Sequence, residues 1–342
     1  RDAVPPAQAA DYERRMKAVV AASFGILPGC RALLPAPLYH SAPSLFTQMA
    51  LLLGEAFVLM PRFREEEVLA LIERHGIDTV YLVPTMYVRL LKLSDKVRTR
   101  YDLSSLRFVA STGAPCAPAL KQAMIDWLGP VVNETYASSE TGMITAIGSV
   151  EALERPGSSG RPFGEATVEI RDEAGKPCAP GEIGLIHVRQ PAYPDFSYRN
   201  QPEARAAIER DGLITLGDMG YLDADGYLFV CDRASDMVIS GGVNIYPAEI
   251  EHALMRCDGV RDCAVFGIPD EEFGEQVMAL VEPHPGETPQ PEAVIEALRR
   301  DIAGYKVPRR IEIVAALPRD DNGKIAKKRL RAPYWAQSGR QI

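Results

Sequence analysis

The sequence lacks the cysteine and histidine patterns of several protein classes. Its six cysteines include no C-x-x-C pair, and its five histidines include no pair at the spacing of metal ligands. Isolated thiols in a chain of 342 residues are typical of a reducing cytosol rather than of a disulfide framework. The sequence therefore favours a cytoplasmic protein without a disulfide scaffold and without a cysteine–histidine metal site.

An excess of positive charge and a long apolar run are missing too. The net charge of −8 argues against non-specific binding to nucleic acid or to anionic membranes, although a few local cations could still hold a small anionic ligand. Residues 1–16 contain no apolar signal core, and the apolar run 49–60 is too short to span a bilayer. We therefore expect neither a nucleic acid partner nor an integral membrane protein.

What the sequence does contain, over its first 150 residues, is an alternation of helix and strand patterns. The length is sufficient for about two domains. The pattern predicts helices at 7–24, 43–53, 65–75, 85–93 and 117–127, and strands that begin at residues 31, 56, 78, 107 and 131. Such alternation implies a largely parallel sheet, and ligands of such sheets bind beyond the carboxyl ends of the strands. The segments STGAP (111–115) and ETYASSETG (134–142) are expected at that edge.

Two other patterns follow this α/β region. Residues 155–232 contain short alternating strands separated by Gly- and Pro-containing turns, which predicts a small antiparallel sheet. After residue 232, the pattern is a strand with a Gly-Gly turn, a helix opening at Pro247, a strand, a long strand, a helix at 290–302 and a last strand, which predicts an α+β domain. The predicted fold is thus α/β in three parts: an α/β subdomain (1–150), a small β subdomain (151–232) and a C-terminal α+β lid domain (233–342).

Three polar loops each have an ordinary structural explanation. Glu140 follows hydroxyl residues, and Ser or Thr followed by Glu often caps a helix. Asp218 is expected in a tight turn, either bonded to its own backbone or accepting from vicinal ribose hydroxyls. Lys324 is not part of a phosphate loop, because Pro318 and Ile325 stand where that motif needs glycine and Ser or Thr. Taken alone, Lys324 indicates a basic tail with a turn.

A further segment, DRASDMVISGGVNIYPAEIE (232–251), is far less generic. A surface helix start needs no Asp-Arg, Gly-Gly and Glu-Ile-Glu at fixed intervals. Together with five other segments, it resembles the motifs of the adenylate-forming superfamily of acyl-CoA synthetases, aryl-CoA ligases, luciferases and peptide-synthetase adenylation domains. The others are PLYHSAP (37–43), STGAP (111–115), TYASSE (135–140), LGD (216–218) and PRDDNGKIAKKRL (318–330). TYASSE departs from the family's Tyr-Gly-x-Thr-Glu by carrying Ala137 and Ser139.

The resemblance implies that ATP and Mg²⁺ activate a carboxylic acid to an acyl-adenylate, which then reacts with the thiol of CoA. Lys324 would be the adenylation lysine, a cation that offsets the charge of the carboxylate and the phosphates in the transition state. Glu140 would be catalytic as the carboxylate that holds Mg²⁺. The implied nucleotide-binding residues are Gly113, Ala114, Pro115, Glu134, Thr135, Tyr136 (against the adenine), Ser139, Asp218 and Arg233 (on the ribose), and Phe229.

The resemblance also implies an acyl pocket and a moving C-terminal domain. The pocket residues would be His40, Ser41, Thr112, Gly113 and Ala137, with no acid–base role for His40. The small residues Ala110, Ala114 and Ala137 indicate a roomy apolar tunnel for a medium or long acyl chain or a bulky ring acid. The domain would rotate at Ser235, where the family usually has aspartate or lysine, and bring Ser240, Gly241 and Gly242 to CoA. Lys306, Lys327, Lys328 and Arg329 would attract the CoA phosphates or form a solvated basic face.

One family motif is missing from this sequence. The Ser/Thr/Gly-rich phosphate loop normally precedes a segment such as PPAQAADYERRM (5–16) and does not occur here. The chain therefore resembles the C-terminal two-thirds of an acyl- or aryl-CoA ligase, which predicts weak or no adenylation by this chain alone. The absent subdomain would leave apolar surface exposed, which favours a homo-oligomer.

Other functions are compatible with parts of this pattern. A non-catalytic fragment that binds a nucleotide or an acyl-adenylate is one alternative. Another is an enzyme that loads the phosphopantetheine of a carrier protein, although no carrier domain follows Ile342, which favours free CoA. A dinucleotide oxidoreductase is excluded because no G-x-G-x-x-G follows a strand.

Overall fold

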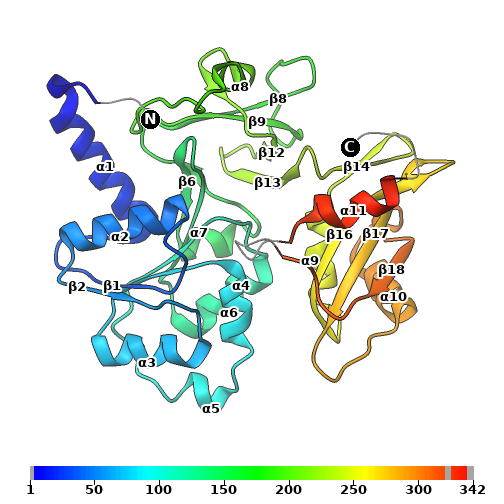
Figure 1. Cartoon of the computed structure of the whole chain (residues 1–342), viewed down its shortest axis with the longest axis horizontal. Coiled ribbons are helices and arrows are strands. Elements are labelled where there is room, and N and C mark those ends of the chain that lie inside the picture. The colour runs from blue at the N-terminus through cyan, green and yellow to red at the C-terminus, as the bar shows by residue number, and fades with distance from the viewer. Residues whose placement is uncertain (1–3, 320–324, 337–342) are drawn as a thin grey trace. The chain divides into compact units, whose positions relative to one another are not determined.

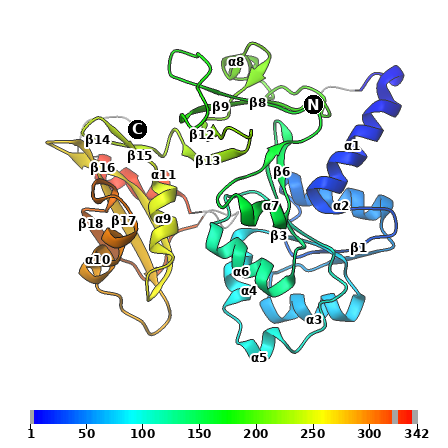
Figure 2. The same ribbon diagram turned by 180° about the vertical axis from the view of Figure 1, so that it is seen from behind.

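The structure is a computed structural model that describes residues 4–319 and 325–336, so Lys324 lies outside the described residues. The chain divides into two compact units (Figures 1 and 2). The first unit comprises Arg1–Leu216 with Gly220–Val230, and the second comprises Gly217–Met219 with Cys231–Ile342. The division falls inside two strands, β12 (Asp218–Leu222) and β13 (Leu228–Arg233).

A seven-stranded sheet forms the centre of the first unit. Its strand order is β2-β1-β3-β4-β5-β6-β7. The pairs from β2 to β5 are parallel, whereas β5 with β6 and β6 with β7 are antiparallel. The strands are β1 (Arg31–Leu34), β2 (Ala56–Leu59), β3 (Thr79–Leu82), β4 (Phe108–Ser111), β5 (Val132–Ser138), β6 (Gly142–Ile147) and β7 (Arg161–Pro162). The predicted α/β class with a mostly parallel sheet is confirmed.

Helices cover both faces of this sheet. Figure 1 shows α1 and α2 on one side and α3, α4 and α6 on the other. The helical elements are η1 (Pro6–Gln8), α1 (Ala9–Phe24), α2 (Ser41–Leu53), α3 (Glu65–His75), α4 (Pro84–Leu91), α5 (Asp95–Arg98), α6 (Pro118–Leu128) and α7 (Ser149–Glu154). α1 ends at Gly25, whose φ is 66° and where a Cβ would lie 2.3 Å from the Phe108 ring. Only glycine fits that position, for reasons of both conformation and space.

Two of the predicted loops are strands in the structure. Most of the segment 134–142 belongs to the β5–β6 hairpin, so the alternative of a capped helix start is wrong. β-Branched and aromatic residues on both sides of the turn favour strands and outweigh the cap-like Ser-Glu pattern. Asp218 begins β12 rather than lying in a tight turn, because the bend precedes it at Gly217, whose φ is 84°.

A second sheet in the chain matches the predicted small β subdomain in its short antiparallel strands. Its order is β10-β11-β9-β12-β13, and β8 pairs with β9. The elements not yet given are β8 (Thr167–Arg171), β9 (Gly184–Arg189), α8 (Pro202–Ala207), β10 (Glu209–Arg210) and β11 (Leu213–Ile214). Ile144, Ile170, Ile186 and Leu228 form a buried cluster, which joins this sheet to β6. The helices α5, α7 and α8 are short and were absent from the sequence prediction.

The second unit is built on the sheet β15-β14-β17-β16, with β18 parallel to β17. Its elements are β14 (Val238–Ser240), β15 (Val243–Ile245), α9 (Pro247–Leu254), β16 (Val260–Asp270), β17 (Gly274–Pro283), α10 (Pro291–Asp301), η2 (Gly304–Lys306), β18 (Arg310–Ile313) and α11 (Lys327–Trp335). Residues of α9 and α10 share one apolar cluster with the sheet, and residues of α11 share another. The sequence prediction contained all of these except β15, η2 and α11. Among the described residues, no helix is long and apolar enough to cross a membrane.

Candidate functional site

The turn between β5 and β6 carries Ser139 and Glu140. Its shape is fixed locally, since Ser138 Oγ accepts the Thr141 N–H at 3.0 Å and lies 2.9 Å from Thr141 Oγ1. The strand register shifts between Tyr136 and Ala137, as in a β-bulge. Bulges change the direction of side chains and are common beside active sites. The hairpin therefore presents Glu140 at a turn with a defined backbone.

Two side chains from other parts of the first unit contact this turn. Ser41 Oγ, at the first residue of α2, lies 2.7 Å from Ser139 Oγ. Tyr198 Oη donates a hydrogen bond to Glu140 Oε1 at 3.1 Å. The structure thus brings together Ser41, Ser139 and Glu140, which the resemblance implied, and adds Tyr198. Sequence reasoning missed Tyr198 because its segment has no periodic pattern and no family motif had been recognised in it.

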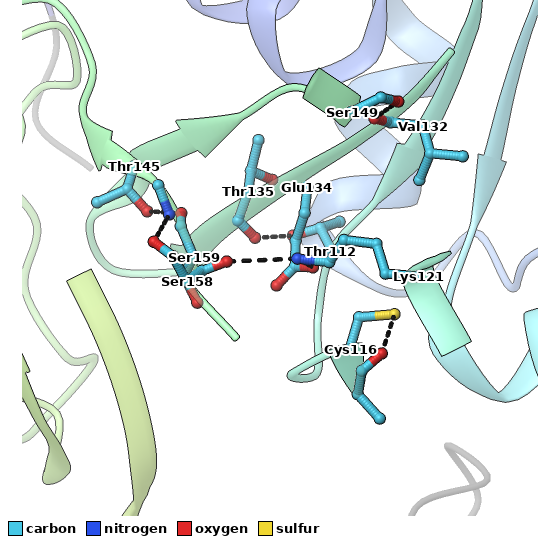
Figure 3. Close-up of polar contacts among 12 residues, drawn as sticks. Thr112, Cys116, Lys121, Val132, Glu134, Thr135, Thr145, Ser149, Ser158 and Ser159 are labelled. Atoms are coloured by element: carbon cyan, nitrogen blue, oxygen red, sulfur yellow. Dashed lines mark hydrogen bonds and ion pairs between the residues drawn. The ribbon is translucent and has the colours of Figure 1, made fainter. Parts of the chain in front are cut away.

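The loop after β4 joins the same hairpin. Thr112 is buried, and its Oγ1 donates to the Thr135 carbonyl oxygen at 3.2 Å, as Figure 3 shows. Gly113 has a φ of 87° and open space at its Cβ position, so its conformation requires glycine. Gly113, Ala114 and Pro115 are exposed, whereas Tyr136 and Ala137 are half-buried. His40 is half-buried, and its ring lies tilted against the exposed Tyr39 ring, with 4.6 Å between the ring centroids.

The Glu134 side chain forms a buried ion pair. Its Oε2 lies 2.7 Å from Lys121 Nζ, and both side chains are only 5% exposed (Figure 3). Lys121 Nζ also donates to the Ser158 carbonyl oxygen at 3.3 Å. Burial raises the pKa of Glu134, and the Lys121 charge opposes that rise. The Glu134 carboxylate is therefore buried and paired with Lys121 of α6, and the contact of Glu134 with the nucleotide stays a prediction.

Asp218 and Arg233 lie together in the second unit. Arg233 Nε is 3.4 Å from Asp218 Oδ1, and the Ala234 N–H donates to the Gly217 carbonyl oxygen at 2.7 Å. The carboxylate and the guanidinium, both predicted on the ribose, are thus neighbours. Phe229 belongs to the first unit and stacks on Tyr221, with ring centroids 4.7 Å apart.

The predicted thiol loop and hinge also lie in the second unit. Ser240 ends β14, and Gly241 and Gly242, with φ of 58° and 81°, turn the chain into β15. The Ser235 carbonyl oxygen accepts a hydrogen bond from Arg331 Nη1 of α11 at 2.9 Å. The predicted hinge residue is therefore tied to the last helix of its own unit.

The basic cluster is only partly a solvated face. Lys306 pairs with Glu249 at 2.6 Å, and Lys327 pairs with Glu251 at 2.8 Å. Burial disfavours the charged form of Lys327, but the charges of Glu251 and Asp232 outweigh it and raise its pKa. Lys327 is thus held in a largely buried ion pair, whereas the partner of Lys306 is exposed, and the binding of CoA phosphates by this cluster stays a prediction. Lys328 and Arg329 are exposed.

The acidic side chains of the described residues suit a metal ion that binds together with a substrate rather than one enclosed by protein ligands alone. They contain no cluster of three or more His, Cys, Asp or Glu side chains able to enclose a metal ion. Glu140 is half-buried, and its carboxylate accepts from a neutral hydroxyl rather than from a cation. Mg²⁺ is commonly held by one or two carboxylates together with substrate phosphates and water. Glu140 therefore fits a Mg²⁺ that arrives with a nucleotide.

Two family models match the chain. The first, AMP-binding enzyme, covers residues 10–193, and the second, AMP-binding enzyme C-terminal domain, covers residues 249–324. The first matched region contains the hairpin with Glu140, and the second ends at Lys324.

Curated proteins and solved structures agree with these models. A feruloyl-CoA synthase from Amycolatopsis sp. is 37% identical over 306 residues, which are 89% of this chain but 62% of that protein. An amide bond synthetase from Marinactinospora thermotolerans has a TM-score of 0.84 and 32% identity, over 96% of this chain and 66% of that one. An o-succinylbenzoate coenzyme A synthetase from Bacillus subtilis, solved with ATP and magnesium ion, has a TM-score of 0.82 and 30% identity, over 93% and 65%. The chain belongs to the AMP-binding, or adenylate-forming, enzymes.

Proposed function

We propose that this chain is part of an acid–thiol ligase that uses ATP and Mg²⁺ to activate a carboxylic acid and then transfers the acyl group to CoA. The observation that carries the proposal is the β5–β6 turn. This turn holds Glu140, whose carboxylate is not paired to any cation among the described residues. The turn lies beside Ser41 of α2, and the hydrogen bond between Thr112 and Thr135 joins its hairpin to the loop of Gly113. CoA ligases among the relatives support the reaction class.

In the first proposed step, a substrate carboxylate oxygen attacks the α-phosphorus of ATP, and the bond to pyrophosphate breaks. Asp218 accepts from the ribose hydroxyls, and Arg233 fixes Asp218 while facing phosphate. Glu140 contributes its negative charge to the metal–nucleotide complex, and Mg²⁺ supplies neutralisation of phosphate charge when it is bound. Lys324, outside the described residues, would offset the charge of the approaching carboxylate.

In the second proposed step, the sulfur of CoA attacks the acyl carbon and AMP leaves, while the thiol proton passes to solvent. The Gly241–Gly242 turn has no side chain that would block a narrow pantetheine arm. Rotation at Ser235 would bring this turn to the acyl-adenylate. The proposed organisation is a subdomain to about residue 150, a β subdomain to 232 and a C-terminal lid, in a cytoplasmic enzyme.

The class of acid is proposed from the lining of the predicted pocket. Ala110, Ala114 and Ala137 are small and apolar, so a roomy apolar tunnel would accept a medium or long acyl chain or a bulky ring acid. The feruloyl-CoA synthase and the long-chain-fatty-acid–CoA ligase among the relatives support both options. Exposed Leu27, Leu51 and Leu52 support the proposed self-association.

A second candidate function is binding without turnover. The observation in its favour is that the chain spans about 60% of the length of the feruloyl-CoA synthase that it matches. One experiment separates the two functions: the 342-residue chain is incubated with ATP, Mg²⁺ and a panel of acids, with and without CoA, and the products are analysed by mass spectrometry. Acyl-CoA formed only with CoA supports the ligase. No product from a chain that binds an acyl-adenylate analogue supports the binding function, and neither product nor binding contradicts both.

Replacing Glu140 by glutamine tests the site itself. The change removes one negative charge at nearly constant shape, so acyl-adenylate formation is expected to fall by about 10²–10³-fold, the scale for a group aimed at reacting charge. Pyrophosphate release measures the rate, and calorimetry measures Mn²⁺-dependent nucleotide binding if the chain does not turn over. Glu154→Gln, at the exposed end of α7, is the control and should match the wild type. Equal values for both variants would remove Glu140 from the site.

A further inference from the structure

Residues 190–198 form a segment of irregular structure that runs alongside the β5–β6 hairpin and contacts it at three successive places. Gln190 Nε2 donates to the carbonyl oxygen of Met143, the second residue of β6, at 3.0 Å. The Tyr193 ring packs against Gly142, and Tyr198 Oη reaches Glu140 at 3.1 Å. Contacts therefore run in order from β6 to the turn, and the last is on the carboxylate.

The contact at Gly142 shows how closely the segment and the turn approach. A Cβ at this position would lie 2.2 Å from the Tyr193 ring, and the φ of 73° is itself unfavourable for other residues. Gln190 also donates to the Phe163 carbonyl oxygen at 3.1 Å, so its amide joins two backbone segments. The segment that carries Tyr198 is thus packed against the hairpin that carries Glu140.

Tyr198 is suited to hold a carboxylate without neutralising it. It is half-buried, and its ring lies edge-on against Phe196 at 5.5 Å between centroids. The hydroxyl of Tyr198 donates to Glu140 Oε1 at 3.1 Å and is a neutral donor. The nearby guanidinium of Arg205 is paired with Asp195 and Glu209. The hydrogen bond of the Glu140 carboxylate is therefore with a neutral hydroxyl rather than with a cationic side chain.

We propose that Tyr198 is a positioning residue, which holds Oε1 of Glu140 so that the carboxylate is oriented before the metal–nucleotide complex binds. The proposal rests on the proposed function, since it assigns Glu140 to that complex. A carboxylate that is already held loses less rotational freedom on binding, which raises its affinity for the cation. A lysine or arginine in place of Tyr198 would hold Glu140 as firmly but would compete with the metal for its charge.

The test is Tyr198→Phe in the full 342-residue chain, with Mn²⁺ as the probe and electron paramagnetic resonance as the readout. The change removes one hydroxyl and keeps the ring against Phe196. With AMP or ATP present, Mn²⁺ binding is expected to weaken about 10-fold, the scale for losing a group that orients a metal ligand. Nucleotide binding in EDTA is expected to stay unchanged, which separates metal positioning from a general loosening of the site.

The matched control is Tyr101→Phe, which removes a hydroxyl that donates to Glu66 at 2.8 Å on the surface around α3. It is expected to leave Mn²⁺ binding unchanged. The proposal is overturned if Tyr198→Phe binds Mn²⁺ like the wild type while Glu140→Gln does not, or if metal-dependent and metal-free binding weaken equally. If Glu140→Gln also binds Mn²⁺ like the wild type, the proposed function of the site fails first, and the two failures remain distinguishable.

Discussion

Replacing Lys121 by methionine is expected to lower the free energy of unfolding of the first unit by about 3–5 kcal/mol, the usual cost of removing one partner of a buried ion pair. Methionine fills a similar volume, so the loss is electrostatic rather than a cavity. It leaves the buried Glu134 carboxylate without its cation and the Ser158 carbonyl oxygen without its donor. Lys17→Met, which breaks an exposed pair with Glu13 on α1, is the matched control and should leave the transition in place.

The loss in Lys121→Met is expected to grow with pH. In the wild type, burial raises the pKa of Glu134 and the Lys121 charge opposes this. Without Lys121 the folded-state pKa is higher still, whereas the unfolded chain keeps the ordinary value of 4.5. Between these two values the folded state binds more protons than the unfolded state, so stability falls as pH rises. The variant should therefore approach the wild type near pH 4 and differ most near pH 8.

The positions of the two tryptophans allow each unit to be followed separately. Trp127 lies on α6, the helix of Lys121, and Trp335 lies on α11 in the second unit. In a Trp335→Phe background, urea unfolding followed by fluorescence reports the first unit alone, which matters because two units need not unfold together. The double variant Lys121→Met with Glu134→Leu should recover most of the loss. If Lys121→Met alone is as stable as the wild type at pH 8, the pair of Lys121 with Glu134 does not stabilise the first unit.

The order of helices and strands could be predicted because each has a local signal. Apolar periodicity marks α1 and α3, and a glycine with positive φ ends each of them, at Gly25 and Gly76. The strand alternation and Gly-Gly turn of the second unit are equally local. The family motifs placed Glu140, Asp218 and Arg233 on segments that the structure describes, and it brings the last two together.

The remaining features of the fold and of the site depend on contacts between segments that are far apart in the sequence, and no local sequence pattern indicates them. Lys121 and Glu134 meet because α6 packs on β5, although each alone resembles a surface charge in the sequence. Tyr198 reaches Glu140 from 58 positions away, along a segment without periodicity. α11 has few apolar residues and contains Pro333, so the basic segment did not indicate a helix. Its stability comes from packing on Phe266 and Leu280, which only the folded unit provides.

Replacing Glu251 by glutamine is expected to lower the free energy of unfolding of the second unit, also by about 3–5 kcal/mol. Glu251 Oε1 accepts the N–H of Val265 on the edge strand β16 at 2.8 Å and lies 2.8 Å from Lys327 Nζ. A glutamine oxygen can still accept from the Val265 N–H, so the lost stability measures the contribution of the negative charge that pairs with Lys327. Glu296→Gln breaks the exposed pair with Arg300 on α10 and is the control, with an expected change within about 0.5 kcal/mol.

The pH dependence of Glu251→Gln should have the opposite slope to that of Lys121→Met. Without Glu251, burial acts on Lys327 with less opposition and lowers its folded-state pKa below that of the wild type. Once the folded-state pKa of Lys327 lies below its ordinary value of 10.5, the unfolded state binds more protons than the folded state between these two values. The stability of the variant then rises as the pH increases toward 10.5. Trp335 fluorescence in a Trp127→Phe background measures this, because Trp335 Nε1 donates to the Gly267 carbonyl oxygen at 3.0 Å.

The same variant should loosen the chain next to the proposed adenylation lysine. Lys327 begins α11 three residues after Lys324, so the pair with Glu251 fixes the described end of that segment. Faster amide hydrogen exchange is expected in α11 but not in α10, because only α11 loses an anchor to α9. Equal exchange in both helices, together with a transition that matches Glu296→Gln, would mean that the apolar contacts of Leu330 and Tyr334 hold α11 without the ion pair.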